Sequence, residues 1–167
     1  MRRFLDTLYK VSGGLAALFI VGVLAAIVTS IVTRQMGIYI GGLDAYAGYS
    51  MAAAGFLALG HTFKRGEHIR VNLLLAALPP KGQMRLDIFA LLIACVLSAS
   101  LAVFSFKLVL DSFTYQDVST SDDATPLWIP QIGMAVGTCI FFIAILDETL
   151  RRLKGHPASQ EQEIHHE

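Results

Sequence analysis

Charged residues are scarce in this sequence, and their scarcity excludes a water-soluble protein. Lys, Arg, Asp and Glu make up 16% of the 167 residues, hydrophobic residues make up 54%, and the mean hydropathy is +0.59. An ordinary soluble domain carries about 25% charged residues. Most of the apolar side chains must therefore face lipid, and the chain is predicted to be an integral membrane protein.

Cysteine is also scarce, and the usual signatures of catalysis are missing. Cys95 and Cys139 lie in separate apolar runs and form no Cys-x-x-Cys pair, which argues against thiol–disulfide exchange and a zinc site. The polar segments lack a phosphate-binding glycine loop, a catalytic triad spacing and paired catalytic carboxylates. We therefore expect no enzyme activity. The net charge of zero gives no reason to expect nucleic-acid binding either.

Four long apolar runs are present, and about 20 apolar residues carry a helix across the hydrocarbon core of a bilayer. Unbroken runs of this length do not resemble the alternating strands of a barrel, so helices are expected. The second run is rich in Ala and Gly and contains polar residues, so we expect it to pack against protein. The predicted fold is all-α integral membrane: a four-helix domain over residues 1–154, with spans at about 11–33, 43–63, 88–109 and 127–150.

Basic residues fall almost entirely on one side of these spans. Eleven of the 13 precede the first span, lie between the second and third spans, or follow the fourth. Only Arg34 and Lys107 fall on the other side, where aspartates gather. Lys and Arg are enriched in cytoplasmic loops. Both termini are therefore predicted to be cytoplasmic, with residues 155–167 as a polar cytoplasmic tail.

The segment between the second and third runs is basic at its start and then continuously apolar. This order predicts a short interfacial helix near residues 68–78, with its leucines beneath the lipid headgroups. An ordinary loop is the alternative. The residues expected to bind phospholipid headgroups, or to anchor the chain at the cytoplasmic surface, are Lys64, Arg65, His68 and Arg70.

An acidic segment, residues 111–123, is expected to form the loop between the third and fourth spans. A solvated connection is the simplest interpretation. The alternative is a docking surface for a soluble partner, because complementary charge steers association. The candidate docking residues on this side of the membrane are Arg34, Asp44, Asp111, Asp117, Asp122 and Asp123.

The fourth run contains a packing pattern and an aromatic residue at its start. Gly133 and Gly137 form a Gly-x-x-x-Gly pattern, which permits close approach of a second helix. We favour packing within the chain over a contact between subunits. Trp128 is predicted to anchor the start of this span at the membrane–water interface.

No Asp, Glu, Lys or Arg is expected near the middle of a span, where transporters place the groups that carry ions. Membrane haem proteins need histidines that project inward from helices, yet only His61 lies near a span. These observations favour a non-catalytic supporting role in a membrane complex, and two alternative functions remain open. One is a membrane anchor subunit of a redox (haem) complex, and the other is a small transporter that works alone.

Three stretches resemble the small membrane subunit, the DctQ-like or Q subunit, of the tripartite ATP-independent periplasmic (TRAP) transporters. The resemblance covers roughly residues 4–154. Arg34 matches a basic position at the end of the first span, and residues 125–137 resemble the Pro-rich, aromatic start of the fourth span. The remaining matches, all within residues 64–80, are Arg65, Gly66, His68, Ile69 and Val71.

The chain departs from the family at the start of the second span. The family commonly has a Trp and paired glutamates there, whereas this sequence has Gly42, Leu43 and Asp44. Only one acid is retained, so a role of the acidic pair in contacts is not carried over.

The resemblance implies a non-catalytic partner of a large, M-type membrane subunit that carries the substrate and sodium sites and moves as an elevator. The small subunit would enlarge the static scaffold in the bacterial inner membrane. A periplasmic binding protein would deliver a carboxylate-containing solute for sodium-coupled symport. No cofactor is expected in this chain, because sodium is expected in the large subunit.

Overall fold

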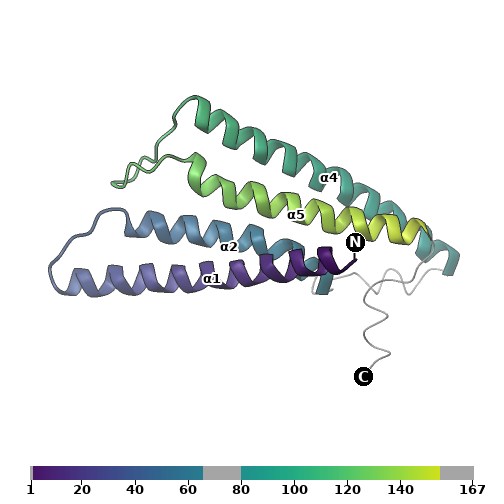
Figure 1. Ribbon diagram of the computed structural model, residues 1–167, viewed down its shortest axis with the longest axis horizontal. Coiled ribbons are helices and arrows are strands. Elements are labelled where there is room, and N and C mark those ends of the chain that lie inside the picture. Colours follow the sequence, from purple (N-terminus) through teal and green to yellow (C-terminus); the bar gives the residue numbers. More distant parts are fainter. Residues whose placement is uncertain (1, 66–79, 155–167) are drawn as a thin grey trace, which may run out of the picture.

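Four helices form the part of the chain that the computed structural model describes, residues 2–65 and 80–154 (Figure 1). Within these ranges no strand is formed, and one isolated β-bridge joins Val118 and Pro126. The all-α prediction is therefore confirmed. The helices are α1 (Arg2–Gln35), α2 (Leu43–Arg65), α4 (Pro80–Thr114) and α5 (Trp128–Leu153).

Helices α1 and α4 are longer than the apolar runs that predicted them. They contain 34 and 35 residues, and at 1.5 Å per residue each is about 50 Å long, well beyond the hydrocarbon core of about 30 Å. The prediction that the outer loop begins at residue 111 was wrong, because Asp111 lies in the last turn of α4. The helix continues there because Ser112 is buried and extends its packed face.

Among the helices of the described ranges, three have the length and apolar composition of membrane spans, namely Leu5–Gln35, Gly82–Thr114 and Trp128–Leu153. Helix α2 is not among them, in keeping with its Ala-rich and polar sequence. It lies between α1 and α5 and buries Ala53, Ala54, Leu57 and Gly60. The prediction that this Ala- and Gly-rich run packs against protein therefore agrees with its place between two helices.

The helices stand in a row in the order α1, α2, α5, α4 (Figure 1). In the described ranges α4 packs against α5 and makes no contact with α1 or α2. The row is therefore open, not closed into a bundle. It consists of two hairpins, α1–α2 and α4–α5, and the shorter helix of each hairpin lies at the centre.

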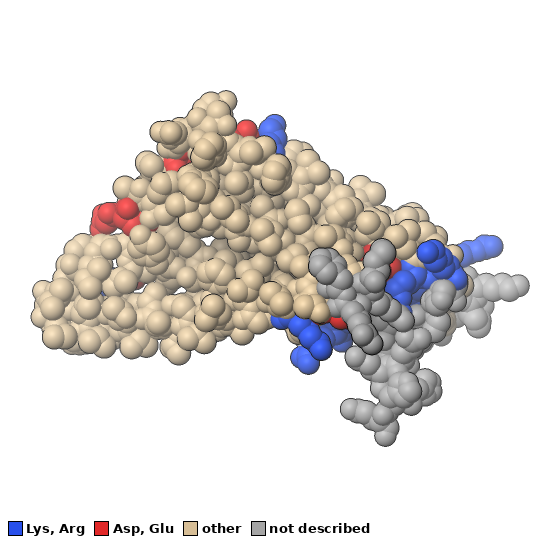
Figure 2. Space-filling model, viewed as in Figure 1, with Lys and Arg blue, Asp and Glu red and all other residues tan. Residues whose placement is uncertain are grey.

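The two ends of the row differ in charge, and we name them accordingly. The basic end, where α1 begins and α2 and α5 end, carries Lys64, Arg65, Arg151 and Arg152. The acidic end consists of residues 36–42 and 115–127, the connections within the two hairpins. On the face shown in Figure 2, Lys and Arg side chains gather mainly towards the first end, and Asp and Glu towards the second.

Helices α2 and α5 run parallel to each other and meet through glycines. A Cβ atom added to Gly137 would lie 2.4 Å from the carbonyl carbon of Phe56. One added to Gly60 would lie 2.8 Å from Cγ2 of Ile140. A small residue of one helix thus faces a larger residue or bare backbone of the other, and both helices contribute glycines to the contact. We call this contact the glycine seam.

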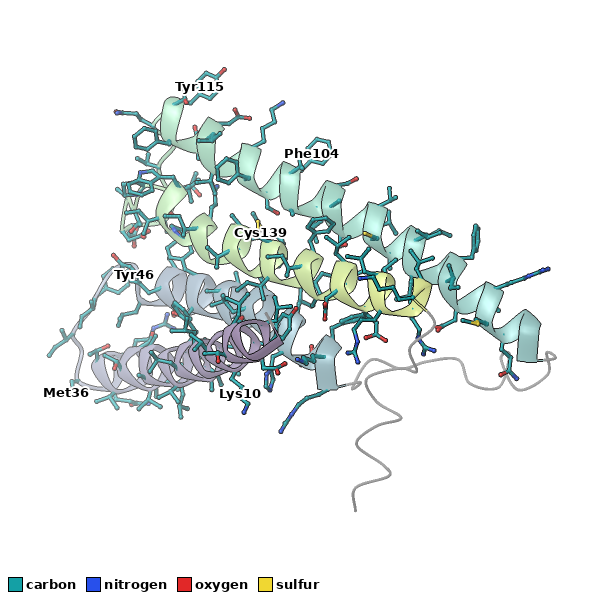
Figure 3. The ribbon with its side chains drawn as sticks, turned by 45° about the vertical axis from the view of Figure 1, so that its right-hand side comes forward. Lys10, Met36, Tyr46, Phe104, Tyr115 and Cys139 are labelled. Atoms are coloured by element: carbon teal, nitrogen blue, oxygen red, sulfur yellow. The ribbon has the colours of Figure 1, made fainter. Side chains whose placement is uncertain are left out.

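Helix α4 packs on α5 through buried residues at regular spacing, most of them small. Leu91, Ser98, Ser105 and Ser112 are buried at intervals of seven residues, which is the repeat of a helix seam with a shallow left-handed crossing. The opposite face of α4 is apolar and exposed, and Phe104 points away from α5 (Figure 3). This is the pattern of a helix that faces lipid or another apolar surface.

Substitution at the glycine seam tests this packing directly. We expect Gly137→Ala to destabilise the chain by about 1–3 kcal/mol, because the added methyl group must push the α2 backbone away. Thermal unfolding of the purified chain in detergent measures the effect. The matched control is Gly55→Ala on α2, where an added Cβ meets nothing within 4 Å. Equal unfolding temperatures for the two variants would contradict the seam.

Candidate functional site at the two ends of the helix row

At the basic end, each hairpin is joined by an ion pair between its two helices. In the first hairpin, Nζ of Lys64 on α2 contacts Oδ1 of Asp6 on α1. In the second, Nη2 of Arg152 on α5 lies 3.2 Å from Oδ2 of Asp87 on α4. Both long helices therefore supply an aspartate near their start, and both short helices supply a base near their end.

The second hairpin carries a larger charge network. Nε of Arg152 lies 3.6 Å from Oε1 of Glu148, and Nη1 of Arg151 lies 3.9 Å from Oε2 of the same carboxylate. Glu148 is only 7% exposed, and a buried carboxylate is costly unless it is paired. The two arginines therefore keep the charge of Glu148 compensated where α5 packs on α4.

The residues predicted to bind headgroups are only partly within the described ranges. Lys64 is held by Asp6, and its Nζ also lies 5.0 Å from the centre of the Tyr9 ring. Arg65 is the last residue of α2 and is exposed. His68, Arg70 and the predicted interfacial helix lie outside the described residues. The headgroup role therefore stays a prediction, and Lys64 has an additional, intramolecular role.

His61 contributes to the packing of α1 on α2. Its Nδ1 lies 3.1 Å from the carbonyl oxygen of Tyr9, and its ring fills the space beside Gly13, where an added Cβ would lie 2.8 Å from Cγ of the histidine. One turn away, the hydroxyl of Ser12 donates to the carbonyl of Leu57. His61, one of the polar residues that lower the hydropathy of α2, is therefore used in a helix–helix contact.

At the acidic end, three tyrosines of the α1–α2 hairpin contact the 115–127 connection. The hydroxyl of Tyr39 donates to Oδ2 of Asp122. The hydroxyl of Tyr49 donates to Oγ of Ser119 at 2.7 Å and lies 3.4 Å from Oδ2 of Asp123. We call this set of contacts the tyrosine clasp; its members are Tyr39, Tyr46 and Tyr49 on one side and Ser119, Asp122, Asp123 and Thr125 on the other.

Tyr46 completes the clasp from the first turn of α2. Its hydroxyl lies 3.3 Å from Oγ1 of Thr125, and its ring packs edge-on against that of Tyr49 with the centroids 6.0 Å apart. In Figure 3 Tyr46 lies where the α1–α2 hairpin approaches the 115–127 connection, whereas Tyr115 points away from the row.

Gly41 and Gly42 allow the two connections to approach closely, and backbone hydrogen bonds hold the 115–127 connection in shape. A Cβ added to Gly41 would lie 3.1 Å from Cβ of Asp122, and one added to Gly42 would lie 2.6 Å from Cβ of Asp123. Gly42 also has φ +84°, a conformation that side chains disfavour. On the other side, the amide of Ser119 donates to the carbonyl of Thr125 at 2.8 Å, which closes the 115–127 connection on itself.

The clasp changes the acidity of its members. The hydrogen bond to Asp122 raises the pKa of the Tyr39 phenol above its ordinary value. Hydrogen bonds from Thr125 and Ser119 lower the pKa of Asp123, because they favour its ionised form. Ionised Asp123 therefore stabilises the folded state fully above the ordinary carboxyl pKa of about 4. This stabilisation is lost as the pH falls through the lowered pKa of Asp123.

The six candidate docking residues have different surroundings. Asp122 and Asp123 belong to the clasp. Oδ2 of Asp44 lies 3.1 Å from Nη2 of Arg34, and both side chains are exposed. Asp111 and Asp117 are exposed on the last turn of α4 and on the following connection. The charges available to a partner are therefore fewer than the sequence alone indicates.

Sequence reasoning missed the tyrosines of the clasp and the aspartates of the basic end. Tyr46 and Tyr49 are three residues apart and so share one face of α2, which was an available signal. Nothing local marked Asp6 or Asp87 as partners of basic residues on another helix.

The predicted packing residues of the fourth span contact α2, and the predicted anchoring residue contacts α4. Gly133 and Gly137 face α2 of the same chain, and a Cβ on Gly133 would lie 2.9 Å from Cβ of Ala53. The ring of Trp128 packs edge-on against Phe113 of α4, with the centroids 5.6 Å apart. Trp128 thus joins the start of α5 to the end of α4.

No obvious metal site is formed in residues 2–65 and 80–154, where no three His, Cys, Asp or Glu side chains gather closely enough to hold an ion. Cys95 on α4 and Cys139 on α5 are free thiols. The polar groups that the structure brings together are hydrogen-bond and ion-pair partners of one another.

Comparison with known proteins identifies the group to which this arrangement belongs. Residues 23–155 match the family model described as tripartite ATP-independent periplasmic transporters, DctQ component. A comparison with curated proteins finds no match. The matched range includes α2, α4 and α5 and the last part of α1, from residue 23 onward, and hence the glycine seam and the whole acidic end. Because well over half of the sequence is matched, the chain belongs to the DctQ component family of the TRAP transporters.

Proposed function

We propose that this chain is the non-catalytic small permease subunit of a sodium-coupled TRAP transporter in the bacterial inner membrane. In this proposal a large M-type subunit carries the sodium and solute sites and moves as an elevator. The present chain scaffolds and anchors that subunit, and a periplasmic binding protein delivers a carboxylate-containing solute. Membership of the DctQ family supports a role in a TRAP transporter.

The observation that carries the scaffold role is the position of the charged groups in the described helices. No Asp, Glu, Lys or Arg lies between Lys10 and Arg34 of α1, or between Asp87 and Lys107 of α4. An ion path through the membrane needs such groups at mid-depth. Buried hydroxyls there, such as those of Ser98 and Thr138, donate to carbonyls of their own helices. The middle of the row is therefore suited to packing and not to ion transfer.

We further propose that α2 crosses the membrane as a fourth span. Its 23 residues extend about 35 Å at 1.5 Å per residue, and the helices on both sides bury Ala53, Ala54, Leu57 and Gly60 in its middle. Four crossings bring both termini to one side of the membrane. The excess of basic residues at that end favours the cytoplasm.

The open row also supports the need for a partner. The outer faces of α1 and α4 expose large apolar side chains such as Leu18 at 66% and Phe104 at 67%. In a membrane these faces can meet lipid or the apolar helices of a second subunit. The proposed large subunit offers such helices.

Removal of the chain tests the proposal. We expect cells with the large subunit and binding protein alone to lose sodium-dependent solute uptake, and the full chain to restore it. Vesicles that contain only the purified chain should not accumulate the solute. Uptake by such vesicles would instead support a self-sufficient transporter, and a Soret band in the absorption spectrum of the chain would support the haem-anchor alternative.

A second test addresses anchoring at the basic end. We expect alanine at Arg65, His68 and Arg70 together to lower recovery of the transporter complex, or its uptake rate, without changing solute preference. The physical reason is the loss of basic groups beside anionic headgroups. Lys154→Ala, which removes a base of the same end outside this segment, is the control. Unchanged recovery and uptake in the triple variant would refute the anchoring role.

A third test addresses docking at the acidic end without disturbing the clasp. We expect Asp111→Lys with Asp117→Lys to slow uptake roughly tenfold at low ionic strength, since reversed charge opposes the steering of a complementary partner. Uptake by reconstituted complex is measured against binding-protein concentration at several salt concentrations. The neutral variants with Asn at both positions should be intermediate. An unchanged rate with unchanged salt dependence would exclude these residues from docking.

A further inference from the structure

The tyrosine clasp links two connections that are about 80 residues apart in the sequence. Tyr39 and Asp122 belong to different hairpins, as do Tyr49 and Ser119. Elsewhere the hairpins meet mainly along the glycine seam, at Ala53 to Gly60 of α2. The clasp is therefore the contact that holds the hairpins together at the acidic end.

The geometry of the row gives this contact mechanical importance. Because α4 does not touch α1 or α2 in the described ranges, no second layer of helices braces the two hairpins. Two flat hairpins that meet along one seam can pivot about it. Contacts beyond one end of the seam lie away from the seam residues, and they oppose a scissor-like rotation of one hairpin across the other.

The clasp contains contacts of more than one kind. Asp122 and Asp123 provide carboxylate acceptors for tyrosine hydroxyls, and hydrogen bonds to ionised groups are stronger than neutral ones. Gly41 lies closely against Asp122, so that even a Cβ added there would require a small shift. The 36–42 connection is short, and the amide of Leu127 donates to the carbonyl of Asp117 at 2.9 Å on the other side. Neither connection has much freedom to move alone.

We propose that the tyrosine clasp stays closed throughout the transport cycle and makes the acidic end of this chain a static platform. The inference deepens the proposed scaffold function and rests on it. Motion during transport is then confined to the partner subunit, and a soluble partner always meets the same arrangement of the two connections. Asp122 and Asp123 serve this closure, while exposed Asp111 and Asp117 face solvent.

A covalent lock tests the closed clasp. Gly41→Cys with Asp122→Cys is made in a chain whose Cys95 and Cys139 are replaced by alanine. The Cβ separation of 3.1 Å needs only a few tenths of an ångström of relaxation to reach the range of about 3.5–4.5 Å found in disulfides. Thiol labelling before and after reduction measures bond formation in the complete transporter complex, and each single-cysteine variant is a control.

We expect the bond to form, and oxidation to change the solute uptake of the double-cysteine complex by no more than about twofold relative to its reduced state. Failure of the bond to form would show that the connections are not adjacent. Loss of uptake on oxidation, with recovery on reduction, would show that the clasp must open. A complex inactive in both states would also count against a clasp that functions while closed.

A second variant provides an independent measurement that does not depend on cysteines. Tyr49→Phe removes the hydroxyl that contacts Ser119 and Asp123 and leaves the ring in place. We expect a lower unfolding temperature and slower uptake, whereas Tyr115→Phe, at an exposed ring that points away from the row, should change neither. Faster uptake by Tyr49→Phe would overturn the proposal, because it would make opening of the clasp a slow step.

These outcomes are separable from failure of the proposed function. If uptake does not require this chain at all, the deletion test will show it. The yield of the disulfide and the unfolding temperature of Tyr49→Phe still report whether the clasp is closed in the membrane.

Discussion

Gly137 of α5 lies against the backbone of α2 at Phe56, and Gly60 of α2 accepts the side chain of Ile140 in return. In a bilayer, water does not drive helices together, so association depends on close van der Waals packing and on hydrogen bonds between helices. The two hairpins of this chain have no other extended contact within the described residues. The clasp and the placement of the two exposed apolar faces relative to each other both depend on this seam.

Polar groups are satisfied either within one hairpin or, at the acidic end, between the two hairpins. Lys64 and Arg152 close the two hairpins with Asp6 and Asp87 at the basic end, while tyrosines and aspartates close the row at the acidic end. Between the ends, hydroxyls donate to helix carbonyls. An unpaired polar group in hydrocarbon is expensive, so this division leaves the middle of the row to packing.

Such a row is suited to a supporting role within a transporter of the DctQ type. Its two flanking helices are apolar on their outer faces, and its charged groups lie at the two surfaces. Internal pairing uses many of those charges. Two of the aspartates that suggest a docking surface in the sequence are thus the means by which the two connections hold each other.

The sequence by itself determined the helices and the uneven distribution of charge, because long apolar runs and Lys/Arg bias are local properties. Its resemblance to the DctQ family, carried by short motifs, is confirmed by the family match over residues 23–155. Only the tertiary structure decided that α2 lies between α1 and α5, that Asp122 and Asp123 bind tyrosines, and that Asp6 pairs with Lys64. The periodicity of a helix indicates which of its residues share a face, but not which distant helix that face will meet. That choice depends on the close approach permitted by Gly60 and Gly137 from two separate helices.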